Sequence, residues 1–202
     1  MLLVQKQISF GGWWGGASDT SGNFHVAGSN GMIKFDTSGN ISWQKTFTNF
    51  VARNLALDSS GNIYLVGYHN ASTNNRAVII KYNSSGTLQW QRQIYQTGID
   101  NQIDSVRIDP VSGAVVVGIA GKDNNNYGSW FTAKLPVDGS KTGTISASGF
   151  PNLTYEASSL TEGTMTATLT TPTQTVSNGT LSFSAAGLPD NSLGLSATTT
   201  NI

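Results

Sequence analysis

The chain has 202 residues, enough for one ordinary domain or for one domain with an appendage. Its 11 basic and 11 acidic residues give a formal net charge of zero, and without clustered lysine and arginine the surface is unsuited to binding a phosphate backbone. Cysteine is absent, which excludes a disulfide framework, a thiolate nucleophile and a cysteine-ligated metal. No apolar run approaches the length of a membrane-spanning segment.

The first predicted element is a strand over residues 2–10. Its segment VQKQI (4–8) aligns with WQKTF (43–47) and WQRQI (90–94), each of which ends a repeat. We therefore interpret 2–10 as an orphan outer strand whose first three partner strands are missing. The leading MLLV (1–4) is too short for the apolar core of a signal peptide, so we expect a protein that is assembled in the cell that makes it.

Residues 54–94 show how the repeats are built. Four short apolar runs, LAL (55–57), IYLV (63–66), AVII (77–80) and LQW (88–90), are separated by segments rich in glycine, asparagine, aspartate and serine. The residues of the runs favour strands and those of the gaps favour turns. The pattern predicts an antiparallel meander of four strands, and no window of helical length shows a convincing 3.6-residue apolar period.

The same unit occurs before and after this stretch. DTSGNFHVAG (19–28) matches DSSGNIYLVG (58–67), DPVSGAVVVG (109–118) matches again with one inserted residue, and IKFDTSGNISW (33–43) matches IKYNSSGTLQW (80–90). Four-stranded repeats of this length are typical of propeller blades. The sequence therefore predicts an all-β fold, a partial or open β-propeller of about three four-stranded antiparallel blades. The blades are expected at residues 12–47, 51–94 and 103–145, within a repeat region 1–149.

The two motifs, D-x-S-G-N-x-Y-x-x-G and K-Y-N-x-x-G-x-x-x-W, resemble the SBBP-type (seven-bladed β-propeller) repeat over about residues 1–144. Such repeats occur in virion structural proteins of tailed phages, especially marine ones, and in secreted bacterial surface proteins. The resemblance implies a non-catalytic structural or adhesive component of a phage virion, in the tail, a fibre or the capsid surface, assembled in the host cytoplasm. The alternative is a carbohydrate-binding propeller module or bacterial surface lectin, which would be extracellular or on the cell surface.

About three blades are fewer than the four or more of a closed propeller. An open arc leaves unpaired strand edges and an exposed apolar face. We expect other virion proteins, symmetry copies of the chain or its own C-terminal region to cover that face. A host-surface glycan is a further expected ligand in the adhesive role, whereas neither nucleic acid nor membrane insertion is expected.

Residues 150–202 form a threonine- and serine-rich β region. Segment 163–170 alternates apolar residues with threonine, which is the pattern of a half-buried strand. Segment 175–183 has the pattern of a hairpin with Asn178 and Gly179 at its turn. The region is too small to bury a large core alone, so it either packs on the blades as further strands or extends as an adhesion or fibre segment.

Few residues have the pattern of catalytic chemistry. The only histidines, His25 and His69, are interpreted as structural residues, and no Ser/His/Asp arrangement can be argued from spacing. Asp19, Asp58 and Asp109 recur at the same turn of each repeat, where aspartate caps backbone amides and glycine takes positive φ. The acidic residues of the third repeat lack the spacing of an EF-hand loop. We expect no enzyme activity, no metal and no other cofactor.

The aromatic residues and the asparagine-rich loops are the candidates for binding. Trp43 and Trp90 recur with the repeat and are predicted to wedge between blades, and Trp130 is expected to pack similarly. A tryptophan pair at 13–14 is not repeated. Neighbouring strand residues face opposite sides, so at most one of the two rings can be in the core of a half-exposed strand. Either the pair is buried between blades, or it is part of a surface that binds a sugar or a partner. The asparagine-rich loops at 70–75 and 122–128 each join the second strand of a blade to the third, so we expect them on one rim of the propeller arc. The candidate surface comprises Trp13, Trp14, Asn74, Asn75, Asn124, Asn125 and Tyr127.

Overall fold

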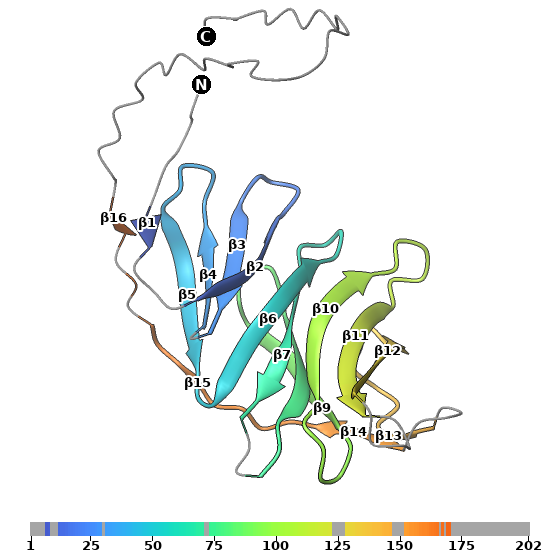
Figure 1. The fold of residues 1–202 in the computed structure, drawn as a ribbon. Coiled ribbons are helices and arrows are strands. Elements are labelled where there is room, and N and C mark those ends of the chain that lie inside the picture. The colour runs from blue at the N-terminus through green and yellow to red at the C-terminus, as the bar shows by residue number, and fades with distance from the viewer. Residues whose placement is uncertain are drawn as a thin grey trace, which may run out of the picture.

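The structure is a computed structural model that describes residues 7–8, 12–29, 31–70, 73–122, 128–146, 152–165, 167 and 169–170 (Figure 1). Every regular element in these ranges is a β-strand, and all strand pairs are antiparallel. The predicted all-β class is therefore confirmed. Within the same ranges the larger sheets have three, five and six strands, and none of them closes into a barrel.

The first sheet is a meander of four strands with one short strand added. It comprises β2 (Trp13–Ser18), β3 (Phe24–Gly28), β4 (Gly31–Phe35), β5 (Ile41–Phe47) and, beyond β5, β15 (Glu162–Gly163). Alternation in β3 sends Ala27 to one face and Val26 to the other, so the sheet can pack on both sides.

The second sheet repeats the meander and adds two strands from the C-terminal region. It comprises β6 (Phe50–Leu57), β7 (Ile63–His69), β8 (Arg76–Tyr82), β9 (Leu88–Tyr95), β14 (Leu153–Ala157) and β13 (Gly143–Ile145). The runs IYLV and AVII are unbroken apolar because β7 and β8 lie in the middle of the molecule and are buried on both faces.

The third sheet has three strands, β10 (Gln102–Ile108), β11 (Val115–Lys122) and β12 (Gly128–Leu135). The predicted third repeat runs on to residue 145, but 143–145 form β13, which pairs with β14 at the edge of the second sheet. The range 103–145 therefore spans two sheets. No fourth strand lies beside β12 in the part of the chain that the structure describes.

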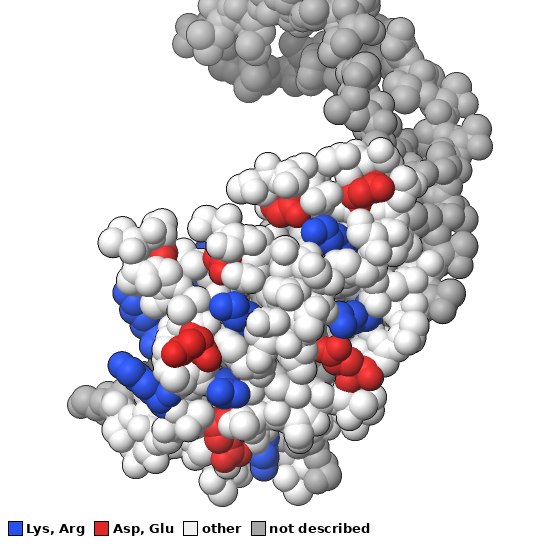
Figure 2. All heavy atoms as spheres, turned by 180° about the vertical axis from the view of Figure 1, so that it is seen from behind, with Lys and Arg blue, Asp and Glu red and all other residues white. Residues whose placement is uncertain are grey.

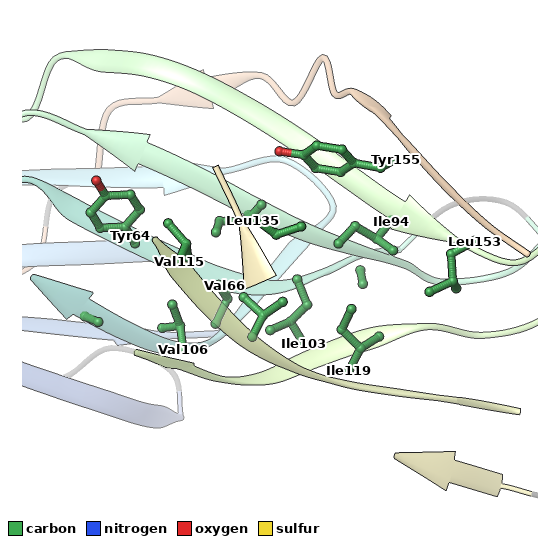
Figure 3. Packing of buried hydrophobic residues seen from close by; sticks show 14 residues of the cluster. Tyr64, Val66, Ile94, Ile103, Val106, Val115, Ile119, Leu135, Leu153 and Tyr155 are labelled. Carbon is green, nitrogen blue, oxygen red and sulfur yellow. The ribbon is translucent and has the colours of Figure 1, made fainter. Parts of the chain in front are cut away.

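The sheets stack face to face through the first strand of each meander. Strand β6 packs across β2, β3 and β4, and β10 packs across β6, β7 and β8. Between the first two sheets lies a core that includes Ala27, Met32, Phe50, Leu55, Leu65 and Ile80. Between the second and third sheets lies the core shown in Figure 3, which includes Tyr64, Val66, Ile79, Ile103, Val106 and Val117. The hydrophobic burial in these two interfaces is what holds the three sheets together.

The described part of the C-terminal region packs on the sheets. Strand β14 pairs with β9, β15 pairs with β5, and Met165 lies in a small core with Ile33 and Phe35. The segment thus runs from the edge of the second sheet to the edge of the first (Figure 1). Two glutamines that follow the repeated tryptophans fasten it: Gln91 exchanges two hydrogen bonds with the backbone of residue 160, and the side-chain oxygen of Gln44 accepts from the amide of residue 167 at 2.9 Å.

A segment near the N-terminus pairs with the C-terminal region through two short strands. Strand β1 (Gln7–Ile8) pairs with β16 (Leu169–Thr170). Of the predicted strand 2–10, only residues 7–8 are described, and they pair with β16 rather than with one of the meanders. The predicted hairpin at 175–183 lies outside the described residues.

Candidate functional site

The repeated acidic turn is a structural device. The carboxylate of Asp58 accepts hydrogen bonds from the amides of Ser60 and Asn62 at 3.0 and 2.9 Å, and from the Asn62 side chain at 2.8 Å. Gly61 completes the turn with a φ of 75°, which glycine adopts without strain. The turns that begin at residues 19, 36 and 109 also direct the aspartate oxygens at the following amides. The turn-forming role predicted for the recurrent aspartates is confirmed.

The recurrent tryptophans lie between consecutive sheets, as predicted. Trp43 of the first sheet packs against Gly86 in the β8–β9 turn of the second sheet. Trp90 of the second sheet packs against Gly139, just beyond the third sheet, and its Nε1 donates to the carbonyl of Val137 at 3.2 Å. Each indole therefore contacts a tight turn that belongs to the next repeat along the chain.

A recurrent lysine makes the same connection between neighbours. Lys34 donates to the carbonyl of Ser84 at 3.3 Å, and Lys81 donates to the carbonyl of Val137 at 3.2 Å. Lys34 also lies 3.4 Å from the carboxylate of Asp19 in its own sheet. Hydrogen bonds from a neighbouring asparagine and from Lys34 outweigh the effect of burial and lower the pKa of Asp19 to about 2.

His25 is buried beside this cluster. Its ring meets Trp43 edge-on with 5.9 Å between centroids, and its Nε2 lies 3.7 Å from Asp19, beyond hydrogen-bond distance. Burial and then the charge of Lys34 lower the pKa of His25. The equivalent residue in the second sheet, Tyr64, donates its hydroxyl to the turn aspartate at 3.1 Å. His25 therefore fills a position in the packing between repeats.

The third sheet departs from this pattern. Trp130 is 65% exposed, so the expectation that it packs like Trp43 and Trp90 is wrong. The physical reason is that no described residues cover the outer face of the third sheet, the face turned away from the second. Lys134, the equivalent of Lys34, bonds to Asp109 of its own sheet at 2.6 Å, and its ammonium lowers the pKa of that carboxyl.

A groove of about 350 Å³ lies on this outer face. It is lined by Ser105, Gly118, Trp130, Phe131 and Thr132, which come from all three strands of the third sheet. Trp130 contributes its exposed ring to this lining beside small residues, whereas the side chain of Phe131 packs against the core between the second and third sheets. Exposed aromatic surface of this kind is typical of sites that bind protein.

The first strand of each meander carries a β-bulge at the same place. The irregularities lie between Trp13 and Gly15, between Ala52 and Asn54, and between Ile103 and Ser105. A bulge re-aims the extra residue, and these extra residues are Trp14, Arg53 and Asp104. Sequence reasoning did not single out Arg53, because the equivalence depends on the register of the strands.

The bulged residues form a continuous row across the three sheets. The guanidinium of Arg53 lies over the ring of Trp14, 4.9 Å from its centroid, and over the ring of Tyr68 at 5.4 Å. The Nε of Arg53 is 3.6 Å from the carboxylate of Asp104. Trp14 is 54% exposed, and its Nε1 donates to the hydroxyl of Ser29 at 3.1 Å. The row therefore presents one fixed aromatic ring at the surface.

The other residues of the predicted surface lie elsewhere. Asn74 and Asn75 line a cleft of about 400 Å³ together with residues 98–102, 120–121 and 128. The amide of Asn75 donates to the carboxylate of Asp100 at 2.7 Å, which ties the β7–β8 loop to the linker before β10. Trp14 does not line this cleft. Trp13 is described as the first residue of β2, and Asn124, Asn125 and Tyr127 lie outside the described residues.

A second polar cleft, also of about 400 Å³, was not predicted. It is lined by Asn49, His69, Asn70, Arg76, Gln93, Ser158, Ser159 and Leu160. Burial and then the nearby charge of Arg76 lower the pKa of His69. No sequence signal marks this cleft, since one of its walls comes from the C-terminal segment about 65 residues after Gln93.

Charges are dispersed over the molecule. Figure 2 shows basic and acidic side chains in small groups, with both signs close together, over the face seen there. In the described ranges no three His, Asp or Glu side chains come together in a group able to hold a metal ion. The same ranges contain no helix long and apolar enough to cross a membrane. The chain matches no model of a known protein family, and no curated protein sequence is significantly similar to it.

Proposed function

We propose that the protein is a non-catalytic structural or adhesive component, built as a partial β-propeller, that binds other protein through the outer face of the third sheet. The observation that carries the proposal is the exposed groove beside Trp130. The equivalent faces of the first and second sheets are each covered by the following sheet. An apolar face with this exposure is stabilised when a partner removes it from water.

The stacking of the meanders supports the propeller interpretation. Each following meander lays its first strand across the preceding sheet, and each recurrent tryptophan packs on a turn of the next repeat. Successive blades of a propeller are related by the same kind of repetition. The side chains that recur are engaged in this packing or in turns, which is what a structural role requires of them.

The setting that we propose is the virion of a tailed phage, at the tail, a fibre or the capsid surface. It rests on the resemblance of the repeated D-x-S-G-N and K-Y-N-x-x-G motifs to SBBP-type repeats. An antibody raised against the purified chain tests this setting by immunogold electron microscopy of phage particles and host cells from the natural source. Gold on one part of the particle is the expected result, and labelling confined to uninfected cells would refute it.

One observation favours carbohydrate binding as a second candidate. Trp14 presents an exposed ring whose orientation is fixed by Ser29 and Arg53, and sugars stack on such rings in polar surroundings. A glycan array with the wild type and with the double variant Trp13→Ala, Trp14→Ala tests it, and Trp130→Ala serves as the control. Specific glycan binding that only the double variant loses would establish the lectin, and the structural role predicts no specific signal.

A further inference from the structure

We propose that the groove on the third sheet seats strand β2 of a second copy of this chain, so that copies associate head to tail. The inference rests on the proposed structural function and names its partner. It follows from the two interfaces inside the chain, which show what a sheet of this kind places on its outer face.

The groove is equivalent to two sites that are already filled. Strand register relates its lining to positions in the other sheets, because Gly118 pairs with Thr132 as Val66 pairs with Ile79 and as Ala27 pairs with Met32. The residue after the bulge completes each set. The three equivalent sets are Gly15, Ala27 and Met32 in the first sheet, Asn54, Val66 and Ile79 in the second, and Ser105, Gly118 and Thr132 in the third.

In both internal interfaces the first strand of the next meander covers this set. Phe50 and Leu55 of β6 lie in the core with the set of the first sheet. Ile103 and Val106 of β10 lie in the core with the set of the second sheet. A first strand is therefore the element that this surface accommodates, and the third set is the one that no described strand covers.

Strand β2 has the features of such an incoming strand. It carries the same bulge, and Gly16 stands at the register position of Leu55 and Val106. The ring of Phe24 lies against Gly16, 2.8 Å from where a Cβ would stand, and Phe24 is 43% exposed. In the proposed assembly, Phe24 supplies the apolar group that the glycine lacks and faces the ring of Trp130.

Among the described residues, only a small group packs on the opposite side of the first sheet. Met165 packs on Ile33 and Phe35 of β4, the middle strand of the sheet, in a small core that Val26 of β3 also joins. Gly16 and Phe24, on the inner strands, remain exposed. The strands equivalent to β2, which are β6 and β10, are the ones that pack on a preceding sheet inside the chain. Within the described ranges no strand covers β2 on this side, so we expect this part of the face to meet another copy.

A lysine completes the match. Lys34 holds the aspartate of its own sheet and a backbone carbonyl in the turn of the next sheet at the same time. Lys134 bonds to its own Asp109, and an ammonium has three donors. The carbonyl equivalent to that of Ser84 in a second copy is that of Thr37, in the turn between β4 and β5. We expect Lys134 of one copy to donate to Thr37 of the next.

The absence of cysteine allows this geometry to be tested directly. Two separately tagged proteins, Lys134→Cys and Thr37→Cys, are mixed and treated with a short bis-maleimide. Both positions are exposed, so the fold should tolerate the changes. We expect a cross-linked dimer that carries both tags. The control pairs Thr37→Cys with Thr73→Cys, an exposed position in the β7–β8 loop, and should give none.

Sedimentation equilibrium supplies a second test. Thr132→Arg places a charge in the groove and should weaken association of the wild-type kind by more than about tenfold, because an unpaired charge is costly to bury. Thr144→Arg, on exposed β13, should leave association unchanged. Three results would overturn the inference. The first is cross-linking only between two Lys134→Cys copies, and the second is cross-linking no greater than in the control. The third is a wild type that stays monomeric at all concentrations. If the antibody labels virions but the chain is monomeric, this inference is wrong and the proposed function stands. If the chain associates head to tail but the antibody labels no virions, the inference stands and the proposed phage setting is wrong.

Discussion

The indole of Trp43 lies against the backbone of Gly86, so closely that a Cβ on the glycine would stand 3.0 Å from the ring. The two residues belong to different sheets, and the tryptophan and the turn glycine that form the contact each recur in both full meanders. The same contact joins Trp90 to Gly139. The tryptophan can pack between the sheets because the turn residue that it contacts is a glycine, which has no side chain to collide with the indole.

Gly86→Ala should destabilise the fold, since the new Cβ meets Trp43 and the residue has a φ of 81°. Strained backbone of this kind costs about 1–3 kcal/mol before the steric clash is added. Gly98→Ala is the matched control, because Gly98 has a φ of 77° and nothing lies within 4 Å of its Cβ position. In urea denaturation, the free energy of unfolding should be clearly lower for Gly86→Ala than for Gly98→Ala. Equal losses of unfolding free energy would show that the contact with Trp43 does not contribute to stability.

Trp90→Ala should be more damaging than Asp58→Ala. Removal of a large packed aromatic typically costs about 3–5 kcal/mol, and Trp90 packs on the core between the second and third sheets. Loss of the turn hydrogen bonds of Asp58 should cost on the order of 1 kcal/mol. Chemical denaturation of both variants checks the order, and the opposite order would contradict the assignment of the wedge and the turn.

Acid should destabilise the protein through Asp19. Because the pKa of Asp19 in the folded state, about 2, is below its ordinary value, its stabilising contribution is complete above about pH 5 and is lost progressively as the pH falls toward 2. Asp19→Asn should remove this part of the pH dependence and keep the turn, since Asn83 forms the same backbone hydrogen bonds in the second sheet. Urea midpoints measured from pH 5 to pH 2 provide the comparison, and parallel curves for the two proteins would refute the prediction.

His25 should add a second dependence at higher pH. Since burial lowers its pKa in the folded state, the unfolded chain binds the proton more readily, and stability should fall as the pH drops below about 6.5. His25→Tyr should reduce this loss, because Tyr64 shows that a tyrosine fits the equivalent site and bonds the turn aspartate. His69 is present in both proteins, so its own titration cancels in the comparison of thermal midpoints. A wild type and variant with the same slope between pH 7 and 5 would contradict the assignment.

Gln91→Ala should loosen the C-terminal segment from the sheets. The side chain of Gln91 donates to the carbonyl of Leu160 at 3.2 Å and accepts from its amide at 3.0 Å, and each lost hydrogen bond is worth about 1 kcal/mol. Hydrogen exchange over residues 158–163 should become faster. Gln89→Ala is the control, since Gln89 is exposed and bonds only to carbonyls beside it. Unchanged exchange in the Gln91 variant would mean that strand pairing alone holds the segment.

The predicted binding residues illustrate how far sequence reasoning reached. The unrepeated tryptophan pair drew attention to Trp14, which the structure places at the surface. Its neighbour Arg53 was missed, because the two meet only through bulges that put residues 39 positions apart at equivalent places. The exposure of Trp130 was mispredicted because this residue lies on β12, the third strand of its meander, whereas Trp43 and Trp90 lie on the fourth strands β5 and β9.

The sequence by itself determined the strands of the meanders, their turns and their repetition. These features depend on the alternation of apolar and polar residues along a strand and on hydrogen bonds within about five residues, as in the turn at Asp58. They can therefore be predicted from residues that are close together in the sequence. The tertiary structure alone decided that 143–145 join the second sheet, that Met165 covers Ile33, and that the third sheet keeps an exposed outer face. The physical reason is that edge pairing and face packing are decided between segments far apart in the chain, where several partners satisfy the same local pattern.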